Sequence, residues 1–421
     1  MALPHSLRAF RHRDYRLYFA GQGISQTGTW LQAIATSWLI YELSHSAFML
    51  GLATFAQYIP MLVLGPFAGV WVDRMKKRQV LIVTQLVALA QSLAMLGLLL
   101  SGHLDAWHLV LANLVLGLVN AFDSPARQAQ LVELVGGKED LPNAIAFSST
   151  LMNGARFIGP LIGGAVIAGL GVVWSFGLNC LLRGAVLGAL MLIRAKPRPT
   201  EKGGGSLVRQ LAEGVRYAFG FLPTRSLLLL TAAVSFAVQP YQSLAPYFAR
   251  DVFHGGSDVL GYLIGSGGFG AVSGMVFLAV RPSVRGLLRQ APYFACMAGT
   301  ALIVFAFAPS LWLAMPMLYL VGMGAMVTAA STNTILQTIV EDRMRARVVS
   351  LYMMSFMGVL PLGAFVAGLL AERVGAPVTL AAGGAIALLA AFAYWAKLET
   401  IRREIRPVYE KLGIVPASDE S

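Results

Sequence analysis

Twelve long apolar segments, separated by short polar connections, are the feature that most limits what this chain can fold into. A helix crosses the hydrocarbon core of a bilayer with about 20 residues at a rise of 1.5 Å per residue. The segments therefore predict an all-α membrane protein with twelve transmembrane helices. They cover roughly residues 16–41, 47–72, 79–101, 106–126, 143–169, 172–193, 226–248, 258–280, 291–308, 311–337, 348–371 and 375–397.

The composition excludes an ordinary soluble protein. Hydrophobic residues make up 57% of the chain and charged residues only 12%, whereas soluble proteins carry about 25% charged residues. A net charge of +12 would indicate nucleic-acid binding in a soluble chain. Here the cations lie between apolar segments, so they predict topology and contact with anionic membrane lipid, and no nucleic-acid partner is expected. Cys180 and Cys296 both lie inside apolar segments, so neither a disulfide framework nor a metal site is expected, and no cofactor is implied.

The distribution of cations predicts the orientation in the membrane. With twelve crossings, almost all lysines and arginines fall on one side, and the other side holds only Arg250 and Arg373. Cytoplasmic connections carry the excess of Lys and Arg. We therefore expect a multi-pass protein of the bacterial cytoplasmic (inner) membrane with both termini in the cytoplasm. The residues before the first segment lack the apolar core of a cleavable signal peptide, so that segment is expected to remain as a signal anchor.

The middle of the chain divides the segments into two halves. Residues 194–205 are polar and rich in proline and glycine, and Ser206 then precedes a stretch with apolar residues every four positions, 207–221. This stretch predicts an amphipathic helix that either lies on the inner membrane surface or packs as a soluble helix on the loops. The predicted organisation is a first six-helix bundle (1–193), a cytoplasmic linker (194–225), a second six-helix bundle (226–398) and a cytoplasmic tail (399–421). No phosphate-binding loop follows the triple glycine, so ATP is not expected to supply energy.

A charged turn between the second and third segments carries a family resemblance. Gly69 and Asp73-Arg74 are followed by Lys77 and Arg78. This spacing resembles the loop between helices 2 and 3 of the major facilitator superfamily of secondary transporters, with Lys76 in the place of a usual glycine. A plain positive-inside loop is the other interpretation. The resemblance implies two pseudo-symmetric bundles and a cytoplasmic gate in which Asp73 caps helix 11 and Lys77 pairs with Asp123. The implied gate residues are Gly69, Asp73, Arg74, Lys77, Asp123 and Arg127.

Polar residues recur every three or four positions in segments 1, 4, 5, 7 and 10. Such groups are unfavourable in lipid unless they face protein or water. Hydrogen bonding between helices is one interpretation. In the major facilitator fold, helices 1, 4, 7 and 10 line the central cavity, so the resemblance implies that these stripes form its wall. The implied substrate-cavity residues are Gln26, Thr29, Trp30, Gln32, Asn120, Asn153, Arg156, Gln239, Asn333 and Gln337.

Two arginines and one acid lie inside apolar segments. Arg156 is near the middle of the fifth segment, Arg183 near the middle of the sixth, and Asp123 near the end of the fourth. Arg156 either binds an anionic or polyhydroxylated substrate or pairs structurally with Asp123. Helix 6 is peripheral in the major facilitator fold, so Arg183 is expected to be a packing or snorkelling residue. Asp123 is the candidate for proton coupling, with Glu42 and Glu133 as poorer candidates.

The fifth segment also contains a glycine-proline cluster: Gly159, Pro160, Gly163 and Gly164. Proline opens a kink in a helix, and the glycines allow close helix packing. The stretch resembles the core of the antiporter motif in exporters of the superfamily, although Ala155 replaces an upstream glycine. Tight packing alone is the other interpretation.

Six further stretches resemble one branch of the superfamily, the bacterial exporters related to the enterobactin exporter. They are residues 10–18, 26–30, 124–128, 139–144, 153–160 and 350–354. The resemblance implies secondary-active efflux of a small molecule, siderophore-like or drug-like, with an anionic substrate as one option, by alternating access and proton antiport. An importer or uniporter on the same fold, and a non-transporting membrane sensor or lipid translocator, are the alternatives. The expected partners are a small-molecule substrate, protons and membrane lipid, with the chain acting as a monomer. No enzyme motif lies in the helices, so an enzyme is not expected.

Overall fold

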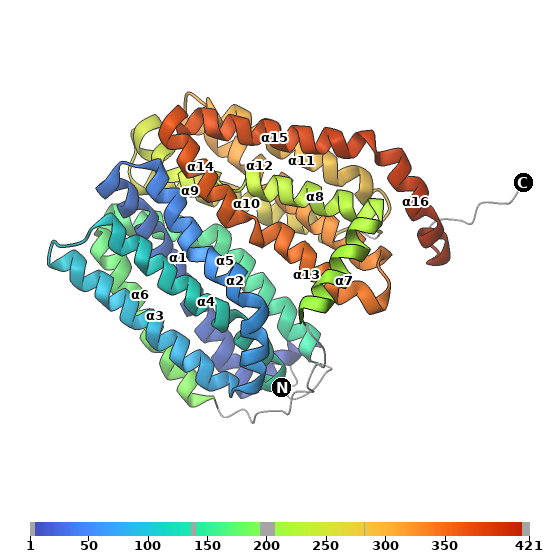
Figure 1. Cartoon of the computed structure of the whole chain (residues 1–421). Coiled ribbons are helices and arrows are strands. Elements are labelled where there is room, and N and C mark those ends of the chain that lie inside the picture. Colours follow the sequence, from blue (N-terminus) through green and yellow to red (C-terminus); the bar gives the residue numbers. More distant parts are fainter. Residues whose placement is uncertain (1–4, 136–139, 194–206, 282, 415–421) are drawn as a thin grey trace, which may run out of the picture. The chain divides into compact units, whose positions relative to one another are not determined.

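The computed structural model describes residues 5–135, 140–193, 207–281 and 283–414, and those residues form helices and connections without strands. Figure 1 shows the helices in chain order. The chain divides into two compact units. Unit 1 holds Met1–Gly203 with Ala245–Gly265, and unit 2 holds Gly204–Leu244 with Ser266–Ser421.

Unit 1 consists of six long helices and three shorter pieces. The long helices are α1 (Arg13–Ser44), α2 (Ala47–Arg74), α3 (Lys77–Leu100), α4 (Ala106–Leu134), α5 (Leu141–Leu170) and α6 (Val172–Leu192). The shorter pieces are the 3₁₀-helix η1 (His5–Arg11), the π-helical turn η2 (Phe248–Val252) and the start of α10 (Ser257–Ala279). Caps define the helix starts: Ser46 accepts a hydrogen bond from the Met49 amide, and Asp105 forms a capping box with His108.

Unit 2 contains two amphipathic helices besides its membrane helices. Its helices are α7 (Leu207–Gly220), α8 (Leu222–Ala237), the first part of α9 (Tyr241–Tyr247), which enters unit 1 at Ala245, the part of α10 from Ser266 on, α11 (Leu287–Ala306), α12 (Leu311–Ile339), α13 (Asp342–Met353), the π-helical η3 (Met354–Gly358), α14 (Leu360–Val374), α15 (Ala376–Ala396) and α16 (Leu398–Lys411). In α16, Ile401, Ile405 and Tyr409 are buried, so one face of this helix packs on the unit. Burial raises the pKa of Tyr409 to about 12.

Two of the predicted membrane helices are interrupted. The seventh segment is built from α8, α9 and η2, and the eleventh from α13, η3 and α14. Pro240 separates α8 from α9, and Pro361 lies in the first turn of α14. Because proline has no amide hydrogen, it cannot continue the hydrogen-bond ladder of a preceding helix.

Eleven stretches of the described chain are long and apolar enough to cross a membrane. The remaining long helix is α1, which has 32 residues and is therefore also long enough. Its polar side chains lower its hydropathy, but Ser25, Gln32 and Thr36 are buried inside unit 1 and do not face lipid. The protein is thus an all-α membrane protein. With α1 added to the eleven other stretches it has twelve spanning helices, and contacts with protein stabilise the polar groups of α1.

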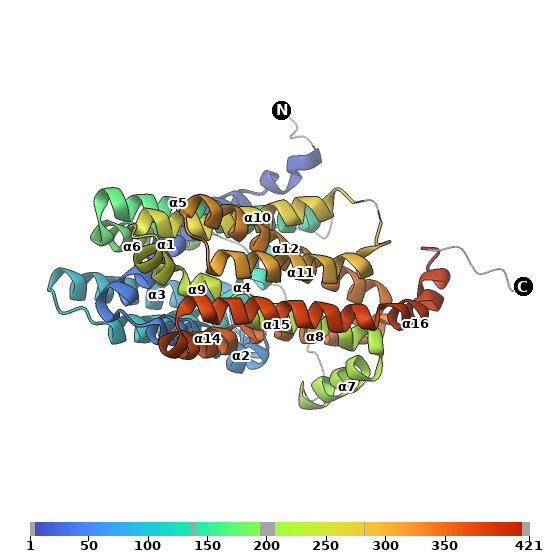
Figure 2. The same cartoon turned by 90° about the horizontal axis from the view of Figure 1, so that it is seen from above.

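The two units repeat the same packing. In unit 1, α6 packs against α1 and α3, and in unit 2, α15 packs against α8 and α11 (Figure 2). A single glycine joins α5 to α6 and another joins α14 to α15: Gly171 has φ 90° and Gly375 has φ 87°. These values lie in the left-handed region that glycine adopts without strain, and they allow two long helices to meet with one connecting residue. The repetition agrees with two pseudo-symmetric six-helix bundles.

Candidate functional site

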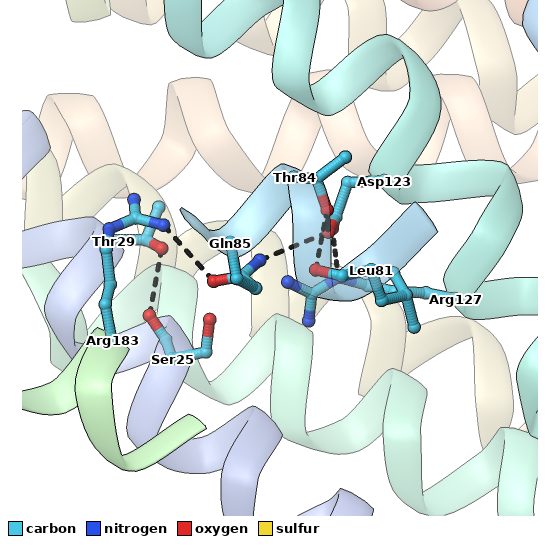
Figure 3. Close-up of polar contacts among 8 residues, drawn as sticks. All are labelled: Ser25, Thr29, Leu81, Thr84, Gln85, Asp123, Arg127 and Arg183. Carbon is cyan, nitrogen blue, oxygen red and sulfur yellow. Dashed lines mark hydrogen bonds and ion pairs between the residues drawn. The ribbon is translucent and has the colours of Figure 1, made fainter. Parts of the chain in front are cut away.

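Asp123 is the centre of a buried polar cluster in unit 1 (Figure 3). It lies on α4 and is 5% exposed. Its Oδ1 accepts hydrogen bonds from Thr84 Oγ1 at 2.8 Å and from Gln85 Nε2 at 3.1 Å, both on α3. Its Oδ2 is paired with Arg127, one helical turn further along α4. The carboxylate therefore ties α3 to α4.

Arg183 extends this cluster from α6. Its side chain is 6% exposed, and Nη1 donates to Gln85 Oε1 at 3.4 Å. With its amide flipped to satisfy its neighbours, Asn179 also accepts from Arg183 Nε at 3.3 Å. Gln85 thus bridges Arg183 and Asp123 (Figure 3). The snorkelling role considered for Arg183 is wrong because α6 packs against α1 and α3 at this point, and the guanidinium group is held by amides inside the bundle.

The cluster contains more positive than negative charge. Asp123 is its one acid, and Arg127 and Arg183 are its two cations among the residues described around it. Arg127 Nη1 is buried without a hydrogen-bond partner in the described part of the chain. Charges buried in a membrane protein must be compensated by pairing, water or ligand, so this arrangement can respond to protons or to a ligand charge.

A pocket with an empty volume of about 280 Å³ opens beside the cluster. Tyr18 and Gln22 of α1 line it together with Gln85, Asp123 and Arg127. This volume includes space that is open to solvent, and the part that can hold water has room for about one molecule. Water in this pocket would give a proton a route to the carboxylate.

A second network adjoins the first and involves Gln32. Its Nε2 donates to Gln91 Oε1 at 2.9 Å, and its Oε1 accepts from Ser92 Oγ at 2.9 Å. Gln32 is only 2% exposed, so the prediction that it lines an open cavity is wrong. The polar residues of α1 cover more than one face, and Gln32 is on the face from which side chains reach Gln91 and Ser92 of α3 and Asn179 of α6.

The other predicted cavity residues of α1 have different surroundings. Gln26 is half-buried, and Thr29 is exposed, with its hydroxyl donating to the Ser25 carbonyl at 2.9 Å. Trp30 covers Gly159 of α5 so closely that a Cβ atom at Gly159 would overlap the indole. Trp30 is therefore a packing residue between α1 and α5.

Asn120 is exposed on α4. The side chains of Asn153 and Arg156, predicted for the cavity, and of Asp73, predicted for the gate, lie outside the described residues.

The glycine-proline cluster of α5 lies against α1 on one side and α10 on the other. A Cβ atom at Gly163 would lie 3.1 Å from Ile34 Cγ1, and one at Gly164 would lie 2.9 Å from Gly261 Cα. The carbonyl of Pro160 faces Gly261 in the same contact. These residues thus provide close helix approach within unit 1.

Two side-chain contacts join the end of α1 to the segment around η2, also within unit 1. Tyr41 donates its hydroxyl hydrogen to Asp251 Oδ2, and Arg250 Nη1 lies 3.6 Å from Glu42 Oε1. They hold the same end of the unit at which α5 contacts α10.

In unit 2, the predicted polar stripes of the seventh and tenth segments meet. Gln239, Thr231 and Ser235 line a narrow gap, too small for a water molecule, together with Thr328 of α12. Further along α12, Gln337 Nε2 donates to Asn333 Oδ1 at 3.0 Å. Asn333 and Gln337 thus lie on α12, whereas Gln239 lies in the turn between α8 and α9.

The charged residues of the turn between α2 and α3 contact partners other than those predicted. Lys77 Nζ lies 3.9 Å from Glu133 Oε1, whereas the cation beside Asp123 is Arg127. The predicted Lys77–Asp123 pair is thus replaced by two others, because Asp123 lies further inside the bundle. Arg78 donates to the carbonyls of the last turn of α6 and caps that helix. Arg74 is exposed and Gly69 has open space around its Cα.

A family model described as transmembrane secretion effector, within the major facilitator superfamily, matches residues 5–407. The chain belongs to this family. This facilitator is similar to the staphyloferrin A transporter of Staphylococcus aureus, with 23% identity over 86% of this chain and 90% of that protein. It is also similar to the multidrug efflux pump Tap of Mycobacterium bovis, with 29% identity over 86% of each chain.

Solved structures of transporters share the fold of this facilitator. A bacterial homolog of the human lysosomal transporter Spinster, in an inward-facing and unoccupied conformation, superposes with a TM-score of 0.71 at 16% identity, over 96% of this chain and 99% of that one. The nucleoside transporter NupG superposes with a TM-score of 0.72 at 12% identity, over 91% of this chain and 98% of that one. These structures show the fold, and the family with its transporter relatives shows that the protein is a multi-pass membrane transporter and not an enzyme.

Sequence reasoning missed the polar residues that this facilitator places on α3. Thr84 and Gln85, followed by Gln91 and Ser92, recur two helical turns apart and so lie on one face of the helix. The same periodicity test that selected the other stripes would have selected this one. Asp251 was missed as well, because a single acid in a loop has no pattern around it.

Proposed function

We propose that this facilitator exports a small organic molecule, of siderophore or drug type, across the bacterial inner membrane by alternating access and proton antiport, with both termini in the cytoplasm. The relatives named above are efflux pumps and a siderophore transporter, which supports efflux. The observation that supports proton coupling is the buried carboxylate of Asp123, which links α3 to α4 and is paired with Arg127.

Asp123 is proposed as the proton-binding site. A proton on Oδ2 would remove the negative charge that Arg127 pairs with, and the ion pair would break. The hydrogen bonds from Thr84 and Gln85 would also weaken, because a hydrogen bond to a charged acceptor is about twice as strong as one to a neutral acceptor. Protonation would therefore loosen α3 from α4, and proton release would tighten them again.

The substrate is proposed to be a molecule with several hydrogen-bonding groups. Gln26, Thr29 and Asn120 in unit 1 are half-buried or exposed polar side chains. Unit 2 separately carries amide side chains at Gln239 and Gln337. Amides and hydroxyls bind polyhydroxylated or amide-rich molecules without requiring a fixed substrate charge.

Everted membrane vesicles test this proposal directly. Candidate siderophores and drugs are offered with and without an imposed pH gradient, and accumulation driven by the gradient is expected for the exported compound. Asp123→Asn should abolish the effect of the gradient. Asp105→Asn is the matched control, because this exposed acid caps α4 from outside the membrane and asparagine caps equally well.

Accumulation that is unaffected by the pH gradient would exclude proton antiport. Accumulation only in vesicles of the opposite orientation would indicate an importer. Transport by Asp123→Asn with a normal response to pH would remove Asp123 from the coupling step.

A further inference from the structure

The linker helix α7 is fastened to α13 within unit 2 (Figure 1). Arg347 Nη1 donates to Glu213 Oε2 at 2.6 Å. The neighbouring Gly214 faces Arg347 so closely that a Cβ atom there would lie 3.1 Å from Arg347 Cβ. The charge pair and the small residue together set where α7 lies along α13.

The two edges of α7 are used differently. Gly214 and Ala218 are buried, and they are four residues apart and so lie on one edge of the helix. Val215 and Phe219 form the adjacent edge and are 42% and 44% exposed. The helix therefore packs on α13 through small residues and leaves its bulky apolar edge uncovered by unit 2.

The chain places this uncovered edge at the membrane surface. α7 ends at Gly220, and the transmembrane stretch Leu222–Val252 begins two residues later. Phe219 lies three residues before this stretch, and three residues span at most about 11 Å, so Phe219 lies close to the boundary of the bilayer. An exposed apolar edge at that depth contacts the region between headgroups and acyl chains.

The charge of the linker selects the kind of lipid. Three arginines (Arg209, Arg216 and Arg225) and one glutamate (Glu213) occur in residues 207–225. Glu213 is already paired with Arg347, and Arg216 is exposed on α7. Basic segments next to a membrane bind anionic lipid with about 1 kcal/mol per Lys or Arg near the surface.

We propose that α7 is a lipid-binding helix: its Val215–Phe219 edge enters the inner leaflet beside anionic phospholipid headgroups, while Glu213 and Gly214 hold it on α13. The assignment to the inner leaflet rests on the proposed orientation, but the contact with lipid does not. This arrangement resolves the two sequence-based alternatives for the amphipathic stretch, since one edge packs on protein and the other on the membrane.

Spin labels on neighbouring residues of α7 test the proposal. The full chain with Cys180→Ser and Cys296→Ser receives a nitroxide at Phe219→Cys or, as the control, at Gly220→Cys, where a Cβ atom meets open space. Adjacent helical residues point about 100° apart, so the two labels differ in direction more than in position. The protein is reconstituted in phosphatidylcholine vesicles with and without phosphatidylglycerol.

The label at residue 219 is expected to collide with oxygen and to lose its collisions with an aqueous nickel chelate, more strongly when phosphatidylglycerol is present. The label at residue 220 is expected to keep its nickel collisions. A label at Val215→Cys repeats the measurement if Phe219→Cys does not fold.

Three results would overturn the proposal. Nickel access at residue 219 equal to that at 220 would make α7 a water-exposed helix. Shielding from both reagents would mean that protein covers the edge. Identical values with and without phosphatidylglycerol would remove the role of anionic lipid. Labelling of Gly220→Cys by an impermeant maleimide on intact cells would reverse the proposed orientation without affecting the lipid contact.

Discussion

Replacing Asp123 by asparagine should destabilise unit 1 strongly, although the two side chains have nearly the same shape. The substitution removes the only acid described in the cluster and leaves Arg127 and Arg183 without compensation. The Asp123 and Arg127 side chains are 7% and 20% exposed, so water can replace little of the lost interaction.

The size of the effect follows from this burial. Breaking a buried ion pair by removing one partner costs about 3–5 kcal/mol. For a domain of 150–250 residues, each kcal/mol corresponds to about 2–4 °C in Tm, so Asp123→Asn should lower Tm by roughly 6–20 °C. Thr84 can still donate its hydrogen bond to the asparagine carbonyl, so Asp123→Asn should lower Tm less than Asp123→Ala.

Thermal unfolding of the purified protein in detergent measures this effect, and a double-mutant cycle isolates its cause. Arg127→Met alone should also destabilise, but Asp123→Asn combined with Arg127→Met should recover a large part of the loss, because the uncompensated charge of Arg127 is gone. A single variant that melts within 2 °C of the natural protein, or strictly additive losses in the double variant, would refute the assignment of Asp123 as the charge that balances Arg127.

Three further outcomes are expected. Gly117→Val should lower the folded yield in size-exclusion profiles, because its Cβ would overlap the α2 backbone, whereas Gly97→Val, in open space, should not. Tyr409→Phe should raise Tm, because the Tyr409 hydroxyl is buried without a partner among the described residues. Its pKa of about 12, above the ordinary 10.0, predicts a contribution to stability that is complete below pH 10 and is lost toward pH 12, so the natural protein should lose stability more steeply over this range than the phenylalanine variant. Tyr41→Phe should speed amide hydrogen exchange in η2, because the hydrogen bond to Asp251 is lost.

Each of these predictions has an outcome that contradicts it. Equal yields for the two glycine variants would mean that α2 and α4 can separate without penalty. A lower Tm for Tyr409→Phe would indicate that its hydroxyl has a partner. Unchanged exchange in η2 would show that the contact with α1 does not restrain that segment.

The sequence was sufficient for the helices and their number. Long apolar segments must be helical in lipid, and the cationic loops between them predict sidedness, because both properties depend on local composition. The short connection between the fifth and sixth segments was also expected from the sequence, whereas its reduction to the single residue Gly171 was seen only in the structure. The resemblance to the major facilitator superfamily then supplied the arrangement of the halves.

Which polar groups meet was decided only by the tertiary structure. The stripe on α1 predicted that Gln32 faces a protein or water interior, but not that its partners are Gln91 and Ser92. Likewise, the sequence placed Arg183 and Asp123 inside apolar segments, but it did not show that Gln85 joins them. A helical period gives the direction of a side chain around its own axis, whereas its partner depends on the rotation and depth of the neighbouring helix, which no local pattern records.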